Sequence, residues 1–176
     1  MQFADDARRV FFGYALPCLN IKVAQKKIDT QTAKELIEKY ANCEELPEGT
    51  ERLFSTAMER CATTARSLNK NAIDTEAVRH YFLFEHNNHV DMEAKLGLLK
   101  KPDYCKVTVG YILKVDKLAH VKKDDGTDMY KIELFPNIEP QTYVAVHRGY
   151  ISDIIDKSLV EKVLEQKGLN MSCLGV

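Results

Sequence analysis

The sequence predicts an α+β protein: an N-terminal helical domain over residues 1–101, then a small β-barrel with a C-terminal helix over residues 102–176. Two observations predict this division. Neither glycine nor proline occurs between Gly49 and Gly97, and apolar residues in that stretch recur at helical spacing. From Lys106 onward, apolar and polar residues alternate with the two-residue period of a β-strand.

The helical domain is expected to contain four main helices. The spacing of apolar residues predicts the first three, in order, as a short helix near Asp5–Gly13, an amphipathic helix over Asp29–Tyr40 and a helix over Leu53–Leu68. The second of these could start at Asp29 or Thr30, or could use Thr32 and Glu35 as a capping box. Asp74 and Thr75 are both good N-caps for the fourth helix, which we expect to end at Asn87-Asn88.

The second domain is expected to contain four strands and a terminal helix. Alternation of apolar and polar residues predicts strands over Lys106–Asp116, Leu118–Lys123, Asp128–Leu134 and Thr142–His147. The Asp124–Gly126 segment predicts a hairpin turn, because Asp-Gly readily adopts positive φ angles. Asp156 can cap the last helix. Short strands joined by tight turns favour a small closed barrel, and the lack of a βαβ pattern argues against a dinucleotide-binding fold.

Composition narrows the functional classes. The 176 residues carry a net charge of −1, and such a balance is unusual for a protein that neutralises phosphates, so nucleic-acid binding is not favoured. The five cysteines are odd in number and contain no C-x-x-C pair, which argues against a disulfide framework and a zinc knuckle. The longest apolar stretch, Val10–Leu19, is about half of the roughly 20 residues that cross a bilayer. We therefore expect a cytoplasmic protein that does not enter a membrane.

Two motifs in the second domain resemble a known family. The first is Cys105-Lys-Val-Thr-Val-Gly110-Tyr-Ile-Leu-Lys-Val-Asp116, and the second is Tyr143-Val-Ala-Val-His147-Arg-Gly149-Tyr-Ile-Ser-Asp-Ile-Ile-Asp156. Both are similar to the signatures of the HypC/HupF hydrogenase maturation chaperones. The resemblance covers about a third of the chain, and Cys105 is internal here, whereas the family cysteine follows the initiator methionine.

The resemblance implies a fold, a role and a set of site residues. Members of the family are small oligonucleotide-binding-like (OB-like) barrels with a C-terminal helix. They are non-enzymatic carriers that transiently hold iron, or another transition metal, and their partners are a maturation scaffold and the metalloenzyme precursor. By this resemblance, Cys105 and His147 are candidate metal ligands. The candidate partner-binding residues are Cys105, Gly110, His147, Gly149 and Tyr150.

Each candidate also has a structural interpretation. Lys106, with Lys100 and Lys101 nearby, would favour a Cys105 thiolate, but a cysteine at the start of a strand can equally be a small apolar residue. His147 can bind metal or hydrogen-bond to a backbone carbonyl. His86 and His89 would share one face of a helix and could bind a metal, or they could be polar residues at a helix terminus.

Three functions remain open on the sequence. No nucleophile elbow, metalloprotease, P-loop or dinucleotide motif is present, so we do not expect an enzyme. The leading hypothesis is an accessory or carrier protein for hydrogenase-type metallocentre maturation. The first alternative is a protein-interaction module with a HypC-like barrel and no metal role. The second is a barrel that binds single-stranded nucleic acid.

Overall fold

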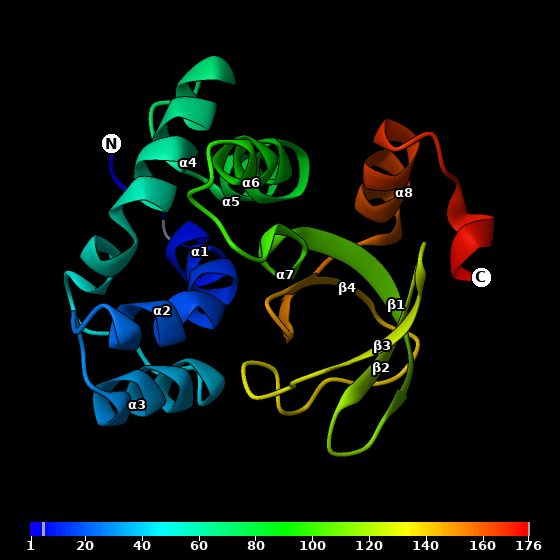
Figure 1. Cartoon of the computed structure of the whole chain (residues 1–176), viewed down its shortest axis with the longest axis horizontal. Helices are drawn as coiled ribbons and strands as arrows, with labels where there is room; N and C mark the ends of the chain where they lie inside the picture. Colours follow the sequence, from blue (N-terminus) through cyan, green and yellow to red (C-terminus); the bar gives the residue numbers. More distant parts are fainter. Residues whose placement is uncertain (5, 176) are drawn as a thin grey trace. The chain divides into compact units, whose positions relative to one another are not determined.

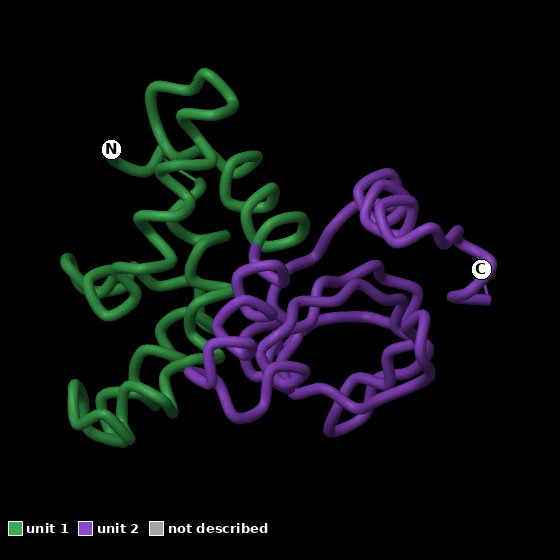
Figure 2. Tube along the Cα trace, turned by 45° about the horizontal axis from the view of Figure 1, so that its top comes forward, with its two compact units in different colours: residues 1–85 green, residues 86–176 purple. Residues whose placement is uncertain are grey.

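The computed structural model describes residues 1–4 and 6–175 (Figure 1). It is α+β, as predicted, with helices followed by a five-stranded antiparallel sheet and a C-terminal helix. The chain divides into two compact units, Met1–Glu85 and His86–Val176 (Figure 2). Within the described residues, no helix has both the length and the apolarity of a membrane span.

Unit 1 is built from helices. They are α1 (Ala7–Ala15), η1 (Leu16–Cys18), α2 (Leu19–Ala24), α3 (Thr30–Ala41), η2 (Thr50–Phe54), α4 (Ser55–Ser67), α5 (Thr75–His80) and the π-helical turn η3 (Tyr81–Glu85). Asp29 caps α3 by accepting from the Thr32 amide at 2.7 Å, and Asp74 caps α5 by accepting from the Ala77 amide at 2.8 Å. The start predicted for the first helix, Asp5, lies outside the described residues.

Aromatic side chains form the core of unit 1. The Tyr14 ring stacks on Phe82 with the ring centroids 4.5 Å apart, and both side chains are buried. Phe11 contacts Phe82 and also the ring of Phe54 at the end of η2. The apolar run near the N-terminus is therefore helical and packed inside the unit.

Unit 2 contains the sheet. Its elements are α6 (His86–Lys95), α7 (Pro102–Cys105), β1 (Val107–Val115), β2 (Ala119–Lys123), β3 (Gly126–Tyr130), β4 (Tyr143–His147), β5 (Tyr150–Ile154), α8 (Lys157–Gln166) and η4 (Met171–Leu174). Asp156 caps α8, as predicted, by accepting from the Leu159 amide at 2.8 Å. Strand β5 was not predicted, because the pairing register shifts opposite Ala145 and Val146 and the segment Ile-Ser-Asp-Ile-Ile does not alternate between apolar and polar residues.

The helix predicted to end at Asn87-Asn88 does not end there, since both residues lie within α6. The side-chain amide of Asn87 is paired with the backbone of β1, donating to Val107 O and accepting from Val107 N, each at 2.8 Å. These bonds join α6 to the sheet. They explain why the second compact unit begins at His86, whereas the sequence predicts a second domain from residue 102.

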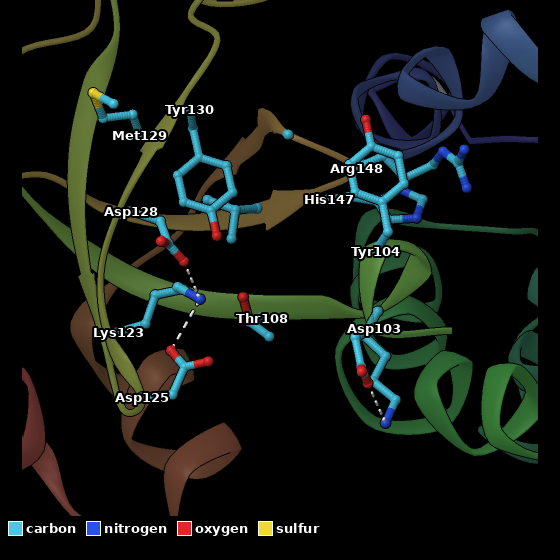
Figure 3. A pocket seen from close by; sticks show the side chains of 13 residues that line it. Asp103, Tyr104, Thr108, Lys123, Asp125, Asp128, Met129, Tyr130, His147 and Arg148 are labelled. Carbon is cyan, nitrogen blue, oxygen red and sulfur yellow. Dashed lines mark ion pairs between the residues drawn. The ribbon is translucent and has the colours of Figure 1, made fainter. Parts of the chain in front are cut away.

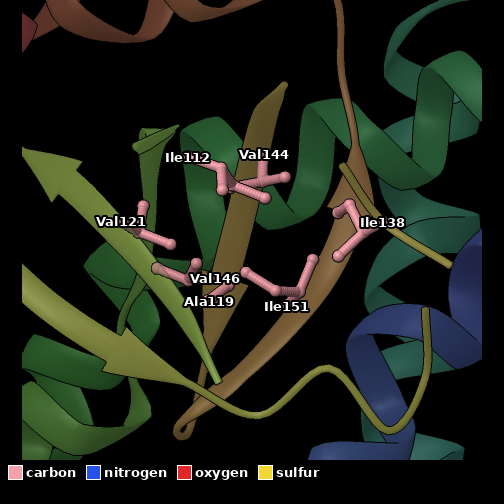
Figure 4. Packing of buried hydrophobic residues seen from close by; sticks show 7 residues of the cluster. All are labelled: Ile112, Ala119, Val121, Ile138, Val144, Val146 and Ile151. Atoms are coloured by element: carbon pink, nitrogen blue, oxygen red, sulfur yellow. The ribbon is translucent and has the colours of Figure 1, made fainter. Parts of the chain in front are cut away.

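The strands lie in the order β3-β2-β1-β4-β5, and each neighbouring pair is antiparallel. The sheet is open, and closure into the predicted barrel is not shown. Among the described residues, its edges meet only at a parallel bridge between Lys131, just after β3, and Tyr150 of β5. Figure 4 shows the core that the curved sheet encloses. It consists of the buried residues Ile112, Ala119, Val121, Ile138, Val144, Val146 and Ile151.

Gly110 occupies a tightly packed position on β1. A Cβ at this position would lie 2.5 Å from Val121 Cγ1 and 2.6 Å from the Lys122 carbonyl oxygen of β2. The oxygen belongs to the backbone of a paired strand and cannot move aside without disturbing the ladder. Glycine is therefore required here by the close approach of β2.

We expect Gly110→Ala to lower the free energy of unfolding of unit 2 by about 1–3 kcal/mol, because the added methyl group overpacks the contact between β1 and β2. Urea unfolding monitored by amide exchange of β1 and β4 measures this. Leu113→Ala is the control on the same strand, since Leu113 is 51% exposed and its truncation should change stability by less than about 0.5 kcal/mol. Equal stabilities of the two variants would contradict the packing argument.

Candidate functional site

A pocket of about 630 Å³ opens in unit 2 between the β2–β3 hairpin and α7. Figure 3 shows Lys123, Asp128 and Tyr130 on one side of it and Tyr104 with Arg148 on the other, while Thr108 of β1 lies between them. The residues that line it come from α7 and the segment after it, from the four strands β1 to β4, and from the β2–β3 and β4–β5 turns. The pocket therefore has two distinct walls, one next to β3 and one next to α7.

Lys123 organises the wall next to β3. Its side chain is only 7% exposed, and its Nζ lies 2.8 Å from Asp128 Oδ2 and 2.9 Å from Asp125 Oδ1. Burial alone lowers the pKa of Lys123, but the hydrogen bonds to Asp128 and Asp125 outweigh burial and place the pKa above its usual value. Burial in turn raises the pKa of Tyr130, with Lys123 opposing the shift. Lys123 is thus a permanent buried cation beneath exposed carboxylates.

Arg148 organises the opposite wall. Arg148 and Gly149 form the two-residue turn between β4 and β5, with φ angles of 50° and 83°, as a type I′ turn requires. Arg148 Nη1 donates to the Sγ of Cys105, and its guanidinium lies 4.8 Å from the centroid of the Tyr104 ring. Cys105, Arg148 and Tyr104 therefore form one connected group at the pocket rim.

The Cys105 thiol has a raised pKa. Burial of the side chain raises the pKa, and the positive charge and hydrogen bond of Arg148 only partly oppose this. The expectation that Lys106 favours the thiolate is not met, because Lys106 pairs with Asp91 at 2.8 Å and with Asp103 at 3.5 Å. At neutral pH, Cys105 is a protonated thiol that accepts a hydrogen bond from a cation.

Two of the predicted histidines lie next to Cys105. His147, at the end of β4, is 3% exposed, and its ring centroid lies 5.4 Å from that of His86. His86 Nε2 lies 3.0 Å from the carbonyl oxygen of Cys105. His89 is three residues further along α6. No group of three or more histidine, cysteine, aspartate or glutamate side chains arranged to hold a metal ion occurs in the described part of the chain.

The other predicted partner-binding residues have different environments. Gly110 is buried beneath β2, whereas Gly149 lines the pocket. Tyr150 is contacted by Lys131, whose Nζ lies 4.9 Å from the ring centroid and 3.3 Å from the hydroxyl oxygen. The structure thus gathers Cys105, His147 and Gly149 around Arg148.

Sequence reasoning missed Arg148, Asn87 and Lys123. A lysine in an alternating strand predicts an exposed side chain, and an asparagine pair predicts the end of a helix. Only the Asp-Asp-Gly turn after Lys123 could have pointed to its ion pairs. Comparison of the chain with protein-family models, curated proteins and solved structures gives no match.

We expect Asn87→Ala to destabilise unit 2 by about 1–3 kcal/mol, because it leaves the buried Val107 backbone without its side-chain partner. Asn88→Ala is the matched control, since Asn88 is the next residue of α6 and is exposed. Thermal unfolding of the two variants measures the difference. A loss of stability as large in Asn88→Ala would mean that helix propensity, not the bond to β1, is responsible.

We expect Arg148→Met to raise the pKa of the Cys105 thiol further, because it removes the positive charge that opposes the effect of burial. Arg148→Lys, which keeps the charge, should raise it less. The pKa is followed by NMR titration of cysteine labelled with ¹³C at Cβ, with Cys105→Ser to assign the signal. A lower pKa in Arg148→Met would contradict this electrostatic account.

Proposed function

We propose that this protein is a non-enzymatic accessory protein that binds a partner protein through the pocket rim formed by Tyr104, Arg148 and Gly149. The observation that carries the proposal is the guanidinium of Arg148, fixed at once on the Cys105 sulfur and on the Tyr104 ring. It holds Tyr104, which is 49% exposed, in one orientation beside the pocket. Fixed tyrosine and arginine side chains at a pocket are typical binding hot spots, because little side-chain entropy is lost on association.

The resemblance to the HypC/HupF chaperones supports this proposal, since those proteins act by binding partners. The sheet is consistent with their architecture. We infer an OB-like barrel that closes at a single bridge, and two features support it: the strand order β3-β2-β1-β4-β5 and the parallel hydrogen bonds that link Lys131 to Gly149 and Ile151. In this interpretation, the pocket lies where the barrel seam is open.

The second candidate is the carrier function for a metallocentre. It is favoured by the proximity of His147, His86 and the Cys105 segment. An iron cargo would need the Cys105 thiolate, however, and the raised thiol pKa and the guanidinium on the sulfur both oppose binding of a metal cation there. We therefore place the interaction function first.

Nucleic-acid binding is the third possibility and is not favoured by the charges at the pocket. The most exposed charged side chains at its rim are carboxylates, with the Asp103 side chain 93% exposed and that of Asp125 70% exposed. The cations Lys123 and Arg148 are buried. Phosphate groups would meet the carboxylates first and be repelled.

We expect a photo-crosslinking amino acid at position 104, introduced in the source cells, to give one discrete protein adduct whose yield falls at least about tenfold in Arg148→Ala. The same amino acid at position 113, which is also half exposed, is the control. No adduct specific to position 104 would refute the interaction function.

Elemental analysis of the protein from the same cells tests the carrier function. The interaction function predicts a metal content far below one equivalent that is unchanged in Cys105→Ala. One equivalent of iron in the wild type, lost in Cys105→Ala, would establish the carrier function instead.

A further inference from the structure

Within the described residues, no strand pairs with β3 on the edge opposite β2. The alternation of hydrogen-bonded and non-hydrogen-bonded pairs in the β2–β3 ladder shows which residues direct their backbone N–H and C=O groups toward that edge. Lys123 and Gly126 pair directly on either side of the two-residue β2–β3 turn, so they form a hydrogen-bonded pair. Alternation along an antiparallel ladder then directs the backbone groups of Thr127 and Met129 away from β2. Lys131 follows the same alternation. Its N–H donates to the Gly149 carbonyl and its C=O accepts from the Ile151 N–H, so neither group bonds to β2.

The outward groups of Thr127 and Met129 have no strand beside them. Within the described residues, the neighbours of β3 are β2 along its length and β5 at the single Lys131 bridge. Upstream of that bridge, the position that β5 would fill is left open, because the chain turns away at Arg148 and Gly149. Met129 is 61% exposed, so this edge is accessible. It offers two N–H donors and two C=O acceptors in strand geometry.

The same edge borders the pocket. Asp128 and Tyr130 of β3 line one wall, and Tyr104 lies across from them (Figure 3). Thr108 and Val146 contribute a partly apolar lining. A strand placed next to β3 would point alternate side chains toward this lining and the others toward solvent.

We propose that an extended, basic peptide segment of a partner protein adds to the sheet along β3, pairing with the outward backbone groups of Thr127 and Met129 and placing an apolar side chain in the pocket. This deepens the interaction function proposed above and rests on it. Main-chain pairing at a sheet edge would supply affinity, and the pocket would select the side chain.

The charges select a basic peptide. The side chains of Asp103, Asp125 and Asp128 are 93%, 70% and 61% exposed. Their cationic partners are less accessible, since the side chain of Lys123 is 7% exposed and that of Lys106 is 29% exposed. An incoming strand therefore meets negative charge at the rim. Lysine or arginine residues two positions before and after its apolar side chain lie on the same, pocket-facing side of the strand and complement that charge.

We expect a fluorescein-labelled peptide of sequence Thr-Lys-Thr-Phe-Thr-Lys-Thr, in which both lysines share the face of the phenylalanine, to bind the full chain in an anisotropy titration. Its Glu-for-Lys counterpart should bind at least about tenfold more weakly. Met129→Pro should weaken binding by at least about tenfold, because proline removes one N–H donor and crowds the edge. This N–H is not part of the β2 ladder, so the fold should persist. Met129→Leu keeps the donor and is the matched control.

Hydrogen exchange of the wild-type protein shows which backbone amides the peptide contacts. It therefore tests the proposal even if Met129→Pro does not fold. On peptide binding, the amides of Thr127 and Met129 should become protected, while those of Asp128 and Tyr130, already paired with β2, should not change. The same peptide N-methylated at alternate residues should lose binding to the wild type. Equal binding by the N-methylated or the glutamate peptide, or protection elsewhere, would overturn the proposal.

The remaining outcomes separate this proposal from the interaction function and from self-association. An adduct at position 104 without protection of Thr127 and Met129 in the complex would refute the edge pairing alone. Peptide-dependent protection without any adduct in cells would support the edge pairing and refute the use of the Tyr104 rim for a partner. Protection that appears on raising the protein concentration without peptide, together with dimer formation, would mean that a second copy occupies the edge and would overturn the proposal.

Discussion

The sheet of unit 2 depends on one strand, β1, which pairs with β2 through one part of its length and with β4 through another. Gly110 allows this, because β2 approaches so closely there that a side chain would collide with a carbonyl oxygen of the partner strand. The start of β1 is in turn held by the Asn87 amide. In the described residues β3 is the last strand of the sheet and pairs with β2, so its other edge is open and the pocket lies beside it.

Arg148 affects both the Cys105 sulfur and the position of the Tyr104 ring at the pocket rim. A turn with two positive φ angles places the guanidinium against the Cys105 sulfur and the Tyr104 ring. The same contact has two consequences. It occupies the thiol that the family resemblance designates as a ligand, and it fixes an exposed aromatic ring next to the pocket. Both consequences favour recognition of a partner over handling of a metal.

Local patterns predicted much of the fold. The caps at Asp74 and Asp156 and the Asp-Asp-Gly hairpin depend on interactions within a few residues, so they could be derived from the sequence. The missed features are long-range. β5 lacks a clean alternation because a register shift reorients it, and the role of Asn87 depends on a strand twenty residues away in sequence. Near the site, Cys105 and His147 were selected mainly by resemblance, whereas Arg148, although it lies within the second motif, was assigned no role.

By itself, the sequence determined the α+β class, the helical part followed by the β part, and the β2–β3 turn, because hydrophobic period, caps and glycine preferences act locally. Only the tertiary structure decided that the sheet stays open at β3, that the Lys123 side chain is buried against two carboxylates, and that burial raises the pKa of the Cys105 thiol. Those properties depend on burial and on charges brought together from distant segments. The electrostatics of a site is set by such neighbours, and no local pattern in the chain records them.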